Sequence, residues 1–204
     1  MLNQNQQNQN QQNMGVPPQQ QFGSQEIMGA HECIGSLTGS IEYYSLHEQY
    51  AQDQELISIM QRQKAFLSQL YNSILDTLKS GKDPAVKTQT YQMEEGNQTT
   101  YGMTPSTPKA PIQSVNEIDD QCVSSAILGH LKGMASGFTM TALESTNPVL
   151  RRILADSVPN IIELAFETYL YQNKHQYYQV PQLSQQDMQA IIHAHAPIPG
   201  NMQH

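Results

Sequence analysis

Apolar side chains recur at intervals of three and four residues in two separate parts of the chain, and this spacing predicts helices with one buried face. The first part, residues 24–81, divides into a helix from Ser24 to about Tyr50 and a second helix after Asp53. Asp53 suits the N-cap position, and Gly81 follows the last apolar position, where helices commonly end. The apolar positions of the second helix are Leu56, Ile59, Met60, Phe66, Leu67, Leu70, Ile74 and Leu78. The sequence therefore predicts a first helical hairpin over this part.

The second part, residues 116–180, predicts another hairpin. One helix is expected over residues 118–144, and the next begins after Asn147, which can cap it and is followed by a proline that suits the first helical position. The apolar stripe of this next helix consists of Leu150, Ile153, Leu154, Ile161, Leu164 and Thr168. Pro159 lies within it and is expected to bend it or open a bulge, because proline removes one backbone hydrogen bond.

Three segments outside the hairpins have a different composition. In residues 1–23 the first 21 positions include 14 Gln or Asn, which predicts a disordered tail. This tail either keeps the protein in solution or associates through side-chain amides. Residues 82–115 carry four prolines and are predicted to form a long exposed crossover loop. Residues 181–204 are expected to hold a short amphipathic helix over 184–193 and a Pro-rich end.

The two hairpins match each other at a constant shift of 94 residues. The matching pairs are Gly35 and Gly129, Leu37 and Leu131, Gly39 and Gly133, Asp53 and Asn147, Leu56 and Leu150, Ile59 and Ile153, Met60 and Leu154, Leu67 and Ile161, and Leu70 and Leu164. Two such hairpins can bury their stripes against each other. The pattern therefore predicts an all-α protein, a ferritin-like four-helix bundle with a long crossover between its hairpins.

Glycines four residues apart lie on one face of the first helix of each hairpin. They are Gly35 and Gly39 in the first hairpin, and Gly129, Gly133 and Gly137 in the second. Each costs about 1 kcal/mol relative to alanine in a helix interior, so another interaction must offset that cost. Close packing of the first helix against the third inside the bundle is the favoured explanation. An oligomer contact on the same face is the alternative.

The ferritin-like connectivity raises the question of a di-iron site, which would need Glu-x-x-His on two helices. The residues three positions before the seven histidines are Met28, Tyr44, Ile127, Gln172, Ala190, Ile192 and Asn201. None of them is glutamate, so the sequence predicts no di-metal site. His193 and His195 form a short tract without a fixed third ligand, which does not define a metal site.

Other polar side chains lie on or beside the apolar stripes, where they either form a buried hydrogen-bonded network or stay at the edge of the stripe. They are His31, Glu48, Gln63, Glu144, Ser157, Glu163 and Glu167. Motifs for a nucleophile, a phosphate loop, a dinucleotide or a Cys-x-x-Cys pair are absent from the sequence. We therefore predict no catalytic residue, no cofactor and no metal ligand. Several carboxylates and an imidazole converging at one buried point would contradict this prediction.

The composition of the chain limits which binding partners and which cellular compartment we expect. A formal net charge of -8 with only 10 Lys and Arg disfavours nucleic acid as a partner. The chain has no apolar run near the roughly 20 residues of a membrane span and no signal-peptide pattern, so we expect it to be made and kept inside a cell. Cys33 and Cys122 lie in predicted helices and are expected to be buried and inert, with a cross-link or reactive thiol as the alternative.

Two segments resemble a known family. Residues 142–151, Ala-Leu-Glu-Ser-Thr-Asn-Pro-Val-Leu-Arg, resemble the central turn of the coat F domain of endospore-forming bacteria. Residues 169–178, Tyr-Leu-Tyr-Gln-Asn-Lys-His-Gln-Tyr-Tyr, resemble the aromatic end of that domain, and the resemblance covers about residues 118–180. It implies a ferritin-like fold and a non-catalytic role in the coat or outer layers of the spore. The implied partners are other spore coat proteins, with copies of the same chain as a further option.

The leading hypothesis is therefore a structural component of the spore, made in the sporulating cell and assembled through protein–protein contacts. Two alternatives stay open at this point. One is a ferritin-like metalloenzyme with an atypical site. The other is a soluble adaptor that recruits partners through the Gln/Asn-rich tail.

Overall fold

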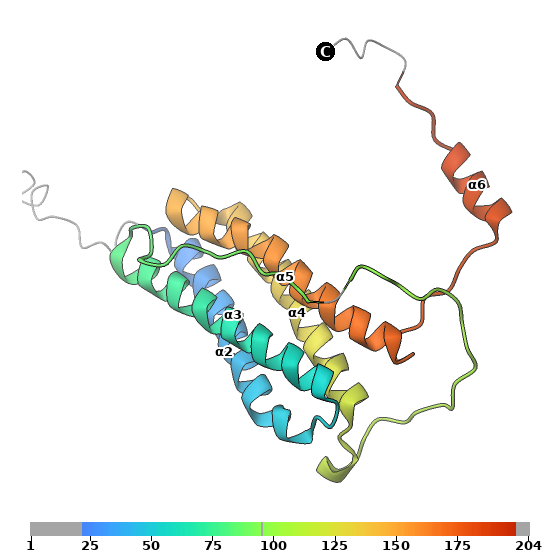
Figure 1. The fold of residues 1–204 in the computed structure, drawn as a ribbon. Helices are drawn as coiled ribbons and strands as arrows, with labels where there is room; N and C mark the ends of the chain where they lie inside the picture. Colours follow the sequence, from blue (N-terminus) through green and yellow to red (C-terminus); the bar gives the residue numbers. More distant parts are fainter. Residues whose placement is uncertain (1–21, 95, 199–204) are drawn as a thin grey trace, which may run out of the picture.

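Four long helices lie side by side in a bundle in the computed structural model, which describes residues 22–94 and 96–198 (Figure 1). They are α2 (Ser24–His47), α3 (Gln54–Ser80), α4 (Asp120–Glu144) and α5 (Pro148–Lys174). The shorter helices are η2 (Glu48–Tyr50), η3 (Val115–Glu117) and α6 (Gln185–His193). The described residues form no strand, so the all-α prediction is confirmed. Of the tail predicted over residues 1–23, residues 1–21 lie outside the described residues.

Side-chain caps begin the helices where the sequence predicts them. The Asp53 carboxylate accepts a hydrogen bond from Glu55 N at 2.9 Å, and Asn147 Oδ1 accepts from Val149 N and Leu150 N, both at 3.0 Å. Gly81 ends α3 with a φ of 69°, a left-handed conformation that glycine adopts at little cost. α5 continues through Pro159 without an interruption of its helical backbone.

The helices of each hairpin pack on each other, and the hairpins meet through α2 against α4 and α3 against α5. Both of these contacts are antiparallel. The start of α2 meets the end of α4, where the Glu26 carboxylate accepts a hydrogen bond from Asn147 N. The start of α3 meets the end of α5, where Asp53 lies beside His175. The crossover therefore travels the length of the bundle before α4 begins (Figure 1).

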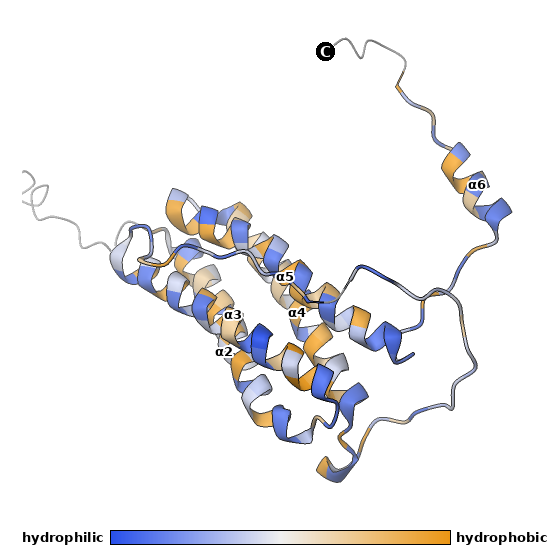
Figure 2. Ribbon diagram, viewed as in Figure 1, coloured by the Kyte–Doolittle hydropathy of each residue, from blue (hydrophilic) through white to orange (hydrophobic). Residues whose placement is uncertain are grey.

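The core lies between the four helices, and Figure 2 shows the hydrophilic and hydrophobic faces of each of them. At the matched apolar positions of the two hairpins, from Leu37 and Leu131 to Leu70 and Leu164, every side chain is at most 4% exposed. The two hairpins therefore share not only the sequence pattern but also the pattern of buried positions. None of the helices in the described part of the chain combines the length and the apolar composition that a membrane span requires.

The predicted role of the spaced glycines inside the bundle is wrong. Gly35, Gly39, Gly129, Gly133 and Gly137 are all exposed, and a Cβ added at any of them would meet no atom within 4 Å. Leu37 explains this placement, because it is buried and lies about 200° around the helix from Gly35. The close approach of α2 to α4 occurs instead at Gly29, where an added Cβ would lie 2.8 Å from Thr141 Cγ2.

The crossover is also less exposed than predicted. Tyr91 is only 7% exposed, its backbone N–H donates to Asn160 Oδ1 at 2.7 Å, and its ring packs edge-on against Phe66. Farther along, Thr100 N donates to Asn173 Oδ1 at 2.6 Å. The crossover is therefore fastened to α3 and α5 over this stretch, whereas residues 102–111 are exposed as predicted.

Candidate functional site

A buried carboxylate on α5 forms the centre of a polar network in the bundle. Glu167 is completely buried. Its Oε1 accepts from Arg62 Nη2 at 2.7 Å, and its Oε2 accepts from Gln63 Nε2 at 2.9 Å and from the Tyr91 hydroxyl. Both oxygens thus have donors, as a charge in a low-dielectric interior requires.

Gln63 extends the network to the first helix of the bundle. Its amide nitrogen also donates to Leu164 O at 3.0 Å, and its Oε1 accepts from the Tyr44 hydroxyl. Burial, reinforced by the charge of Glu167, raises the pKa of both Tyr44 and Tyr91, so both hydroxyls stay protonated and can donate. One network therefore joins α2, α3, α5 and the crossover.

The structure brings together only some of the polar residues selected from the sequence. Gln63 and Glu167 meet in the network, while Ser157 is buried but donates to Ile153 O of its own helix. His31, Glu144 and Glu163 are exposed, and Glu48 is half-buried. Sequence analysis did not include Arg62, Tyr44 or Tyr91 in this group. Tyr44 carried a usable signal, because it lies on the apolar stripe of α2 and has a hydroxyl that needs a partner.

A second buried carboxylate holds the turn between α4 and α5. Glu26 is 1% exposed, and its oxygens accept from Asn147 N at 2.8 Å, the Thr146 hydroxyl at 3.1 Å and Gly23 N at 3.2 Å. The contact fastens the first turn of α2 to a segment 120 residues away. Its role is to position the helix ends.

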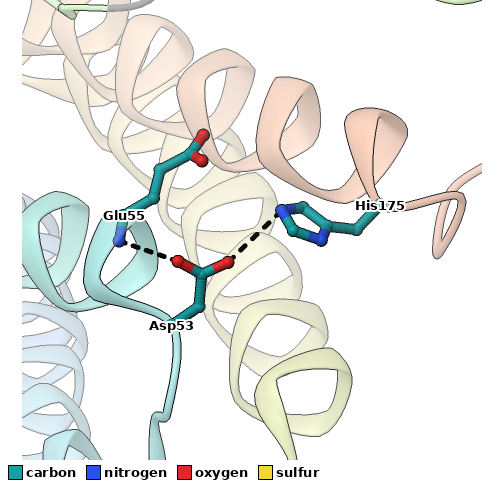
Figure 3. Close-up of side chains that lie close together, drawn as sticks. All are labelled: Asp53, Glu55 and His175. Carbon is teal, nitrogen blue, oxygen red and sulfur yellow. Dashed lines mark hydrogen bonds and ion pairs between the residues drawn. The ribbon is translucent and has the colours of Figure 1, made fainter.

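A third group of charged side chains lies at the opposite end of the bundle, between α3 and α5. Asp53, Glu55 and His175 each place one potential ligand atom within 4.8 Å of the others (Figure 3). Asp53 Oδ2 lies 3.4 Å from His175 Nε2 and 3.3 Å from the Tyr171 hydroxyl. Lys174 Nζ lies 2.7 Å from Glu55 Oε2. We call Asp53, Glu55, Lys174 and His175 the ionic clasp.

The charges of the ionic clasp complement the two helix ends. The acidic residues Asp53 and Glu55 stand at the N-terminus of α3, and the basic residues Lys174 and His175 stand at the C-terminus of α5. Each sign is favourable at its own helix end because of the helix dipole, and antiparallel packing brings the two signs together. The clasp residues are half-buried or exposed, so screening by water limits its strength.

The same atoms include the ligand types of a divalent metal ion. Carboxylate oxygens and an imidazole nitrogen bind zinc and similar ions. Glu55 Oε1 is shielded from solvent and has no hydrogen-bond partner among the described residues, whereas Glu55 Oε2 pairs with Lys174. His193 and His195 are both exposed and lie outside this group. The sequence gives no signal for this group, because its members on α3 and α5 lie about 120 residues apart.

The two cysteines differ in their surroundings. Cys33 is 3% exposed, and its thiol lies 3.4 Å from Thr141 Oγ1. Burial raises the pKa of the Cys33 thiol, which favours the unreactive protonated form. Cys122 is half-buried, and both cysteines are free. The predicted burial therefore holds for Cys33 but only partly for Cys122.

A groove runs along the outer side of the contact between α2 and α4. Its volume is about 580 Å³, and its lining includes the residues we call the glycine groove: Gly39, Tyr43, His47, Gly129, His130 and Gly133. The Tyr43 ring stacks on His47 at 3.8 Å and meets His130 edge-on at 5.1 Å. Burial raises the pKa of Tyr43 to about 12. The groove therefore presents aromatic and bare backbone surface rather than a cluster of acids or nucleophiles.

Comparison with known proteins identifies the family. The Coat F domain model matches residues 119–181, which include all of α4 and α5. The chain is also 44% identical over 200 residues to the spore coat protein F-like protein YhcQ of Bacillus subtilis (strain 168), a match that covers 97% of this chain and 92% of that protein. This chain belongs to the spore coat protein F family. The predicted resemblance is thereby confirmed.

A solved structure supports the fold of this coat F family member. The crystal structure of a candidate spore coat protein from Bacillus halodurans C-125 superposes with a TM-score of 0.57 and 11% sequence identity. The match covers 79% of this chain and 94% of that protein. At this identity the likeness concerns the fold alone. It extends beyond the 63 residues of the domain match and includes most of the described bundle.

Proposed function

We propose that this protein is a non-catalytic structural component of the endospore coat or outer spore layers and acts through protein–protein assembly. The observation that carries the proposal is family membership over nearly the whole chain, shown by 44% identity to a spore coat protein F-like protein. The polar interior supports the structural part of the proposal. Both oxygens of Glu167 on α5 accept hydrogen bonds from α3 and the crossover. These bonds hold the three segments together.

Surface features support assembly as the mode of action. Large apolar side chains are exposed on α2, α4 and α6, among them Leu46 at 61%, Leu143 at 79% and Ile192 at 67%. Leu46 also lines the glycine groove, so exposed apolar surface and a concave surface coincide there, as is common at protein contacts. The glycine groove provides one such concave surface on the bundle.

Localisation through sporulation tests the proposed function. A fluorescent fusion of the full chain should move from the cytoplasm of the sporulating cell to the spore periphery, and the protein should be enriched in purified spores. The same fusion expressed in vegetative cells provides the control. Even distribution in sporulating cells with no enrichment in purified spores would contradict the proposal.

A metal-binding protein is the second candidate, and the grouping of Asp53, Glu55 and His175 is the observation in its favour. We propose instead that these residues act as an ionic clasp without a resident metal. Elemental analysis of protein from metal-replete medium should then find no stoichiometric metal, and EDTA should leave the Tm unchanged. Zinc should raise the Tm of the wild type no more than that of Asp53→Asn, which keeps a capping side chain but loses one charge. A zinc-dependent rise that this variant abolishes, and that exposed Glu163→Gln retains, would establish a metal site.

The adaptor alternative depends on the N-terminal tail. Deletion of residues 1–21 should leave the coat contacts of a bundle-mediated assembly intact. Loss of all partners after this deletion, with an unchanged Tm, would instead favour an adaptor that recruits through its Gln/Asn-rich segment.

A further inference from the structure

At the exposed glycines on α2 and α4, no other part of the bundle comes close. A Cβ at Gly39, Gly129 or Gly133 would meet no atom within 4 Å, yet all three lie in helix interiors and line the same groove. Glycine weakens a helix wherever it replaces alanine. Bare backbone on two neighbouring helices also allows a third helix to approach closely. The groove therefore has the form of a helix-binding surface, and an occupant would account for its glycines.

The helix α6 (Gln185–His193) has the complementary property. All nine of its residues are exposed, and Ser184 caps it by accepting a hydrogen bond from Asp187 N at 3.1 Å. Met188, Ile191 and Ile192 recur at three- and four-residue spacing and are 43%, 56% and 67% exposed. This spacing places them on one face. The chain thus carries an amphipathic helix whose apolar face has no partner among the described residues (Figures 1 and 2).

The connection to α6 is short and leads away from the bundle (Figure 1). Val180 is held beside the crossover, where its carbonyl accepts from Gly102 N at 2.8 Å. The four residues that follow can span at most about 14 Å before Ser184 caps the helix. In the structure this short connection carries α6 away from the bundle, so that the helix and the groove of one chain are both open (Figure 1).

We propose that α6 of one copy docks its Met188, Ile191 and Ile192 face into the glycine groove of a second copy. Helix-in-groove binding uses apolar anchors at this spacing. Tyr43 supplies an aromatic wall for these side chains, and Gly129 and Gly133 provide the bare floor. Exchange of α6 in both directions makes a two-fold symmetric dimer with two identical contacts. The inference rests on the proposed function, because it names one contact through which such a protein assembles.

Sedimentation velocity of the full chain over a range of concentrations tests the exchange. The wild type should form a concentration-dependent dimer. Gly133→Leu places a side chain in the groove at a position where an added Cβ meets no atom within 4 Å, so it should raise the dimer Kd by about tenfold or more. The Tm of the monomer at low protein concentration should stay equal or rise. Ala65→Leu adds comparable bulk at an exposed position of α3 outside the groove and should leave the Kd unchanged.

A disruptive substitution and a matched control test the contribution of α6 in the same way. Ile192→Asp should raise the dimer Kd by about tenfold or more, because it places a charge on the docking face. Gln186→Asp introduces a carboxylate on the opposite face of α6 and should leave the Kd unchanged.

A mixing experiment separates exchange between copies from other arrangements. Gly133→Leu keeps an intact α6, and Ile192→Asp keeps an intact groove, so each should be monomeric alone while an equimolar mixture forms a heterodimer through the one remaining contact. Wild-type monomer at all concentrations, dimerisation of both variants at the wild-type Kd, or failure of the mixture to associate would overturn the inference. Enrichment of such a monomeric protein in spores would leave the proposed function standing.

Discussion

The hairpin of α2 and α3 and the hairpin of α4 and α5 share the same pattern of apolar burial but differ in polarity at two matched positions. Tyr44 and Phe138 occupy matched positions at the shift of 94 residues, and both are buried. Tyr44 donates its hydroxyl to Gln63, while Phe138 has no polar atom to place. The matched position of Gln63 is Ser157, whose hydroxyl donates to Ile153 O of its own helix. Equivalent positions of the two hairpins thus hold either a hydrogen-bonded pair of side chains or a pair without that bond.

The crossover accounts for the polar network between α3 and α5. Tyr91 of the crossover inserts beside α3 and α5, and its hydroxyl needs an acceptor, which Glu167 provides. Arg62 then neutralises Glu167 and pairs with Glu94 of the crossover at 2.8 Å. A buried polar group on one helix therefore requires partners on the segments packed against it. Four measurements of stability can break or refine this contrast between the hairpins, in decreasing order of the expected change.

Replacement of the central carboxylate should have the largest effect. Glu167→Leu removes the acceptor that Arg62, Gln63 and Tyr91 share and leaves Arg62 without its buried counter-charge, so the free energy of unfolding should fall by about 3–5 kcal/mol in urea denaturation. Glu163→Leu on the exposed side of the same helix should change it by less than about 0.5 kcal/mol. A loss below about 1 kcal/mol for Glu167→Leu would show that the network is not needed to hold the bundle.

Exchange of the matched aromatic residues tests the two hairpins directly. Tyr44→Phe leaves Gln63 Oε1 without its main donor. Phe138→Tyr brings a hydroxyl to a fully buried position, where Ser157, the residue matched to Gln63, bonds to its own helix. Each should lower the free energy of unfolding by about 1–3 kcal/mol. Chemical denaturation measures both. Equal stability of wild type and Phe138→Tyr would show that the second hairpin can also accommodate a buried tyrosine hydroxyl at this position.

The buried tyrosines predict a loss of stability at alkaline pH. Because burial raises the pKa of Tyr44 above its ordinary value of 10, the unfolded state releases this proton first as the pH rises. The contribution of Tyr44 to stability is therefore complete below pH 10 and declines above it, as the unfolded state ionises and the folded state keeps its proton. Urea denaturation between pH 8 and 11 measures the decline. Tyr44→Phe should show a smaller decline than the wild type, and an identical one would contradict the assignment.

Glycine-to-alanine substitutions should have the smallest effects. The sign of the change in the free energy of unfolding distinguishes open from packed positions. Gly39→Ala and Gly133→Ala, one in each hairpin, should each raise the free energy of unfolding of the monomer by up to about 1 kcal/mol, because the new Cβ meets no atom within 4 Å. Gly29→Ala should lower it instead, because its Cβ would lie 2.8 Å from Thr141 Cγ2. Thermal unfolding at low protein concentration measures all three. A stabilising Gly29→Ala would contradict the close approach of α2 to α4.

Local signals in the sequence predicted the helices well. Caps at Asp53 and Asn147 and the C-terminal Gly81 each act within a few residues, and all three stand where the structure has them. The apolar stripes likewise predicted the buried faces, because the helical repeat alone determines which side chains share a side. The position of the glycine stripe relative to the bundle could not be predicted in this way. It depends on which helices pack together, and α2 meets α4 through Gly29.

The amino-acid sequence by itself determined the helices, their apolar faces and the family of this protein, because these depend on spacing along the chain and on recognisable segments. Only the tertiary structure decided which distant polar groups meet. Glu26 lies 120 residues from the turn that it holds, and Tyr91 lies 76 residues from Glu167. Such contacts carry no local signal, because they arise when antiparallel packing and the path of the crossover bring the segments together. The polar network, the ionic clasp and the glycine groove all originate at that level.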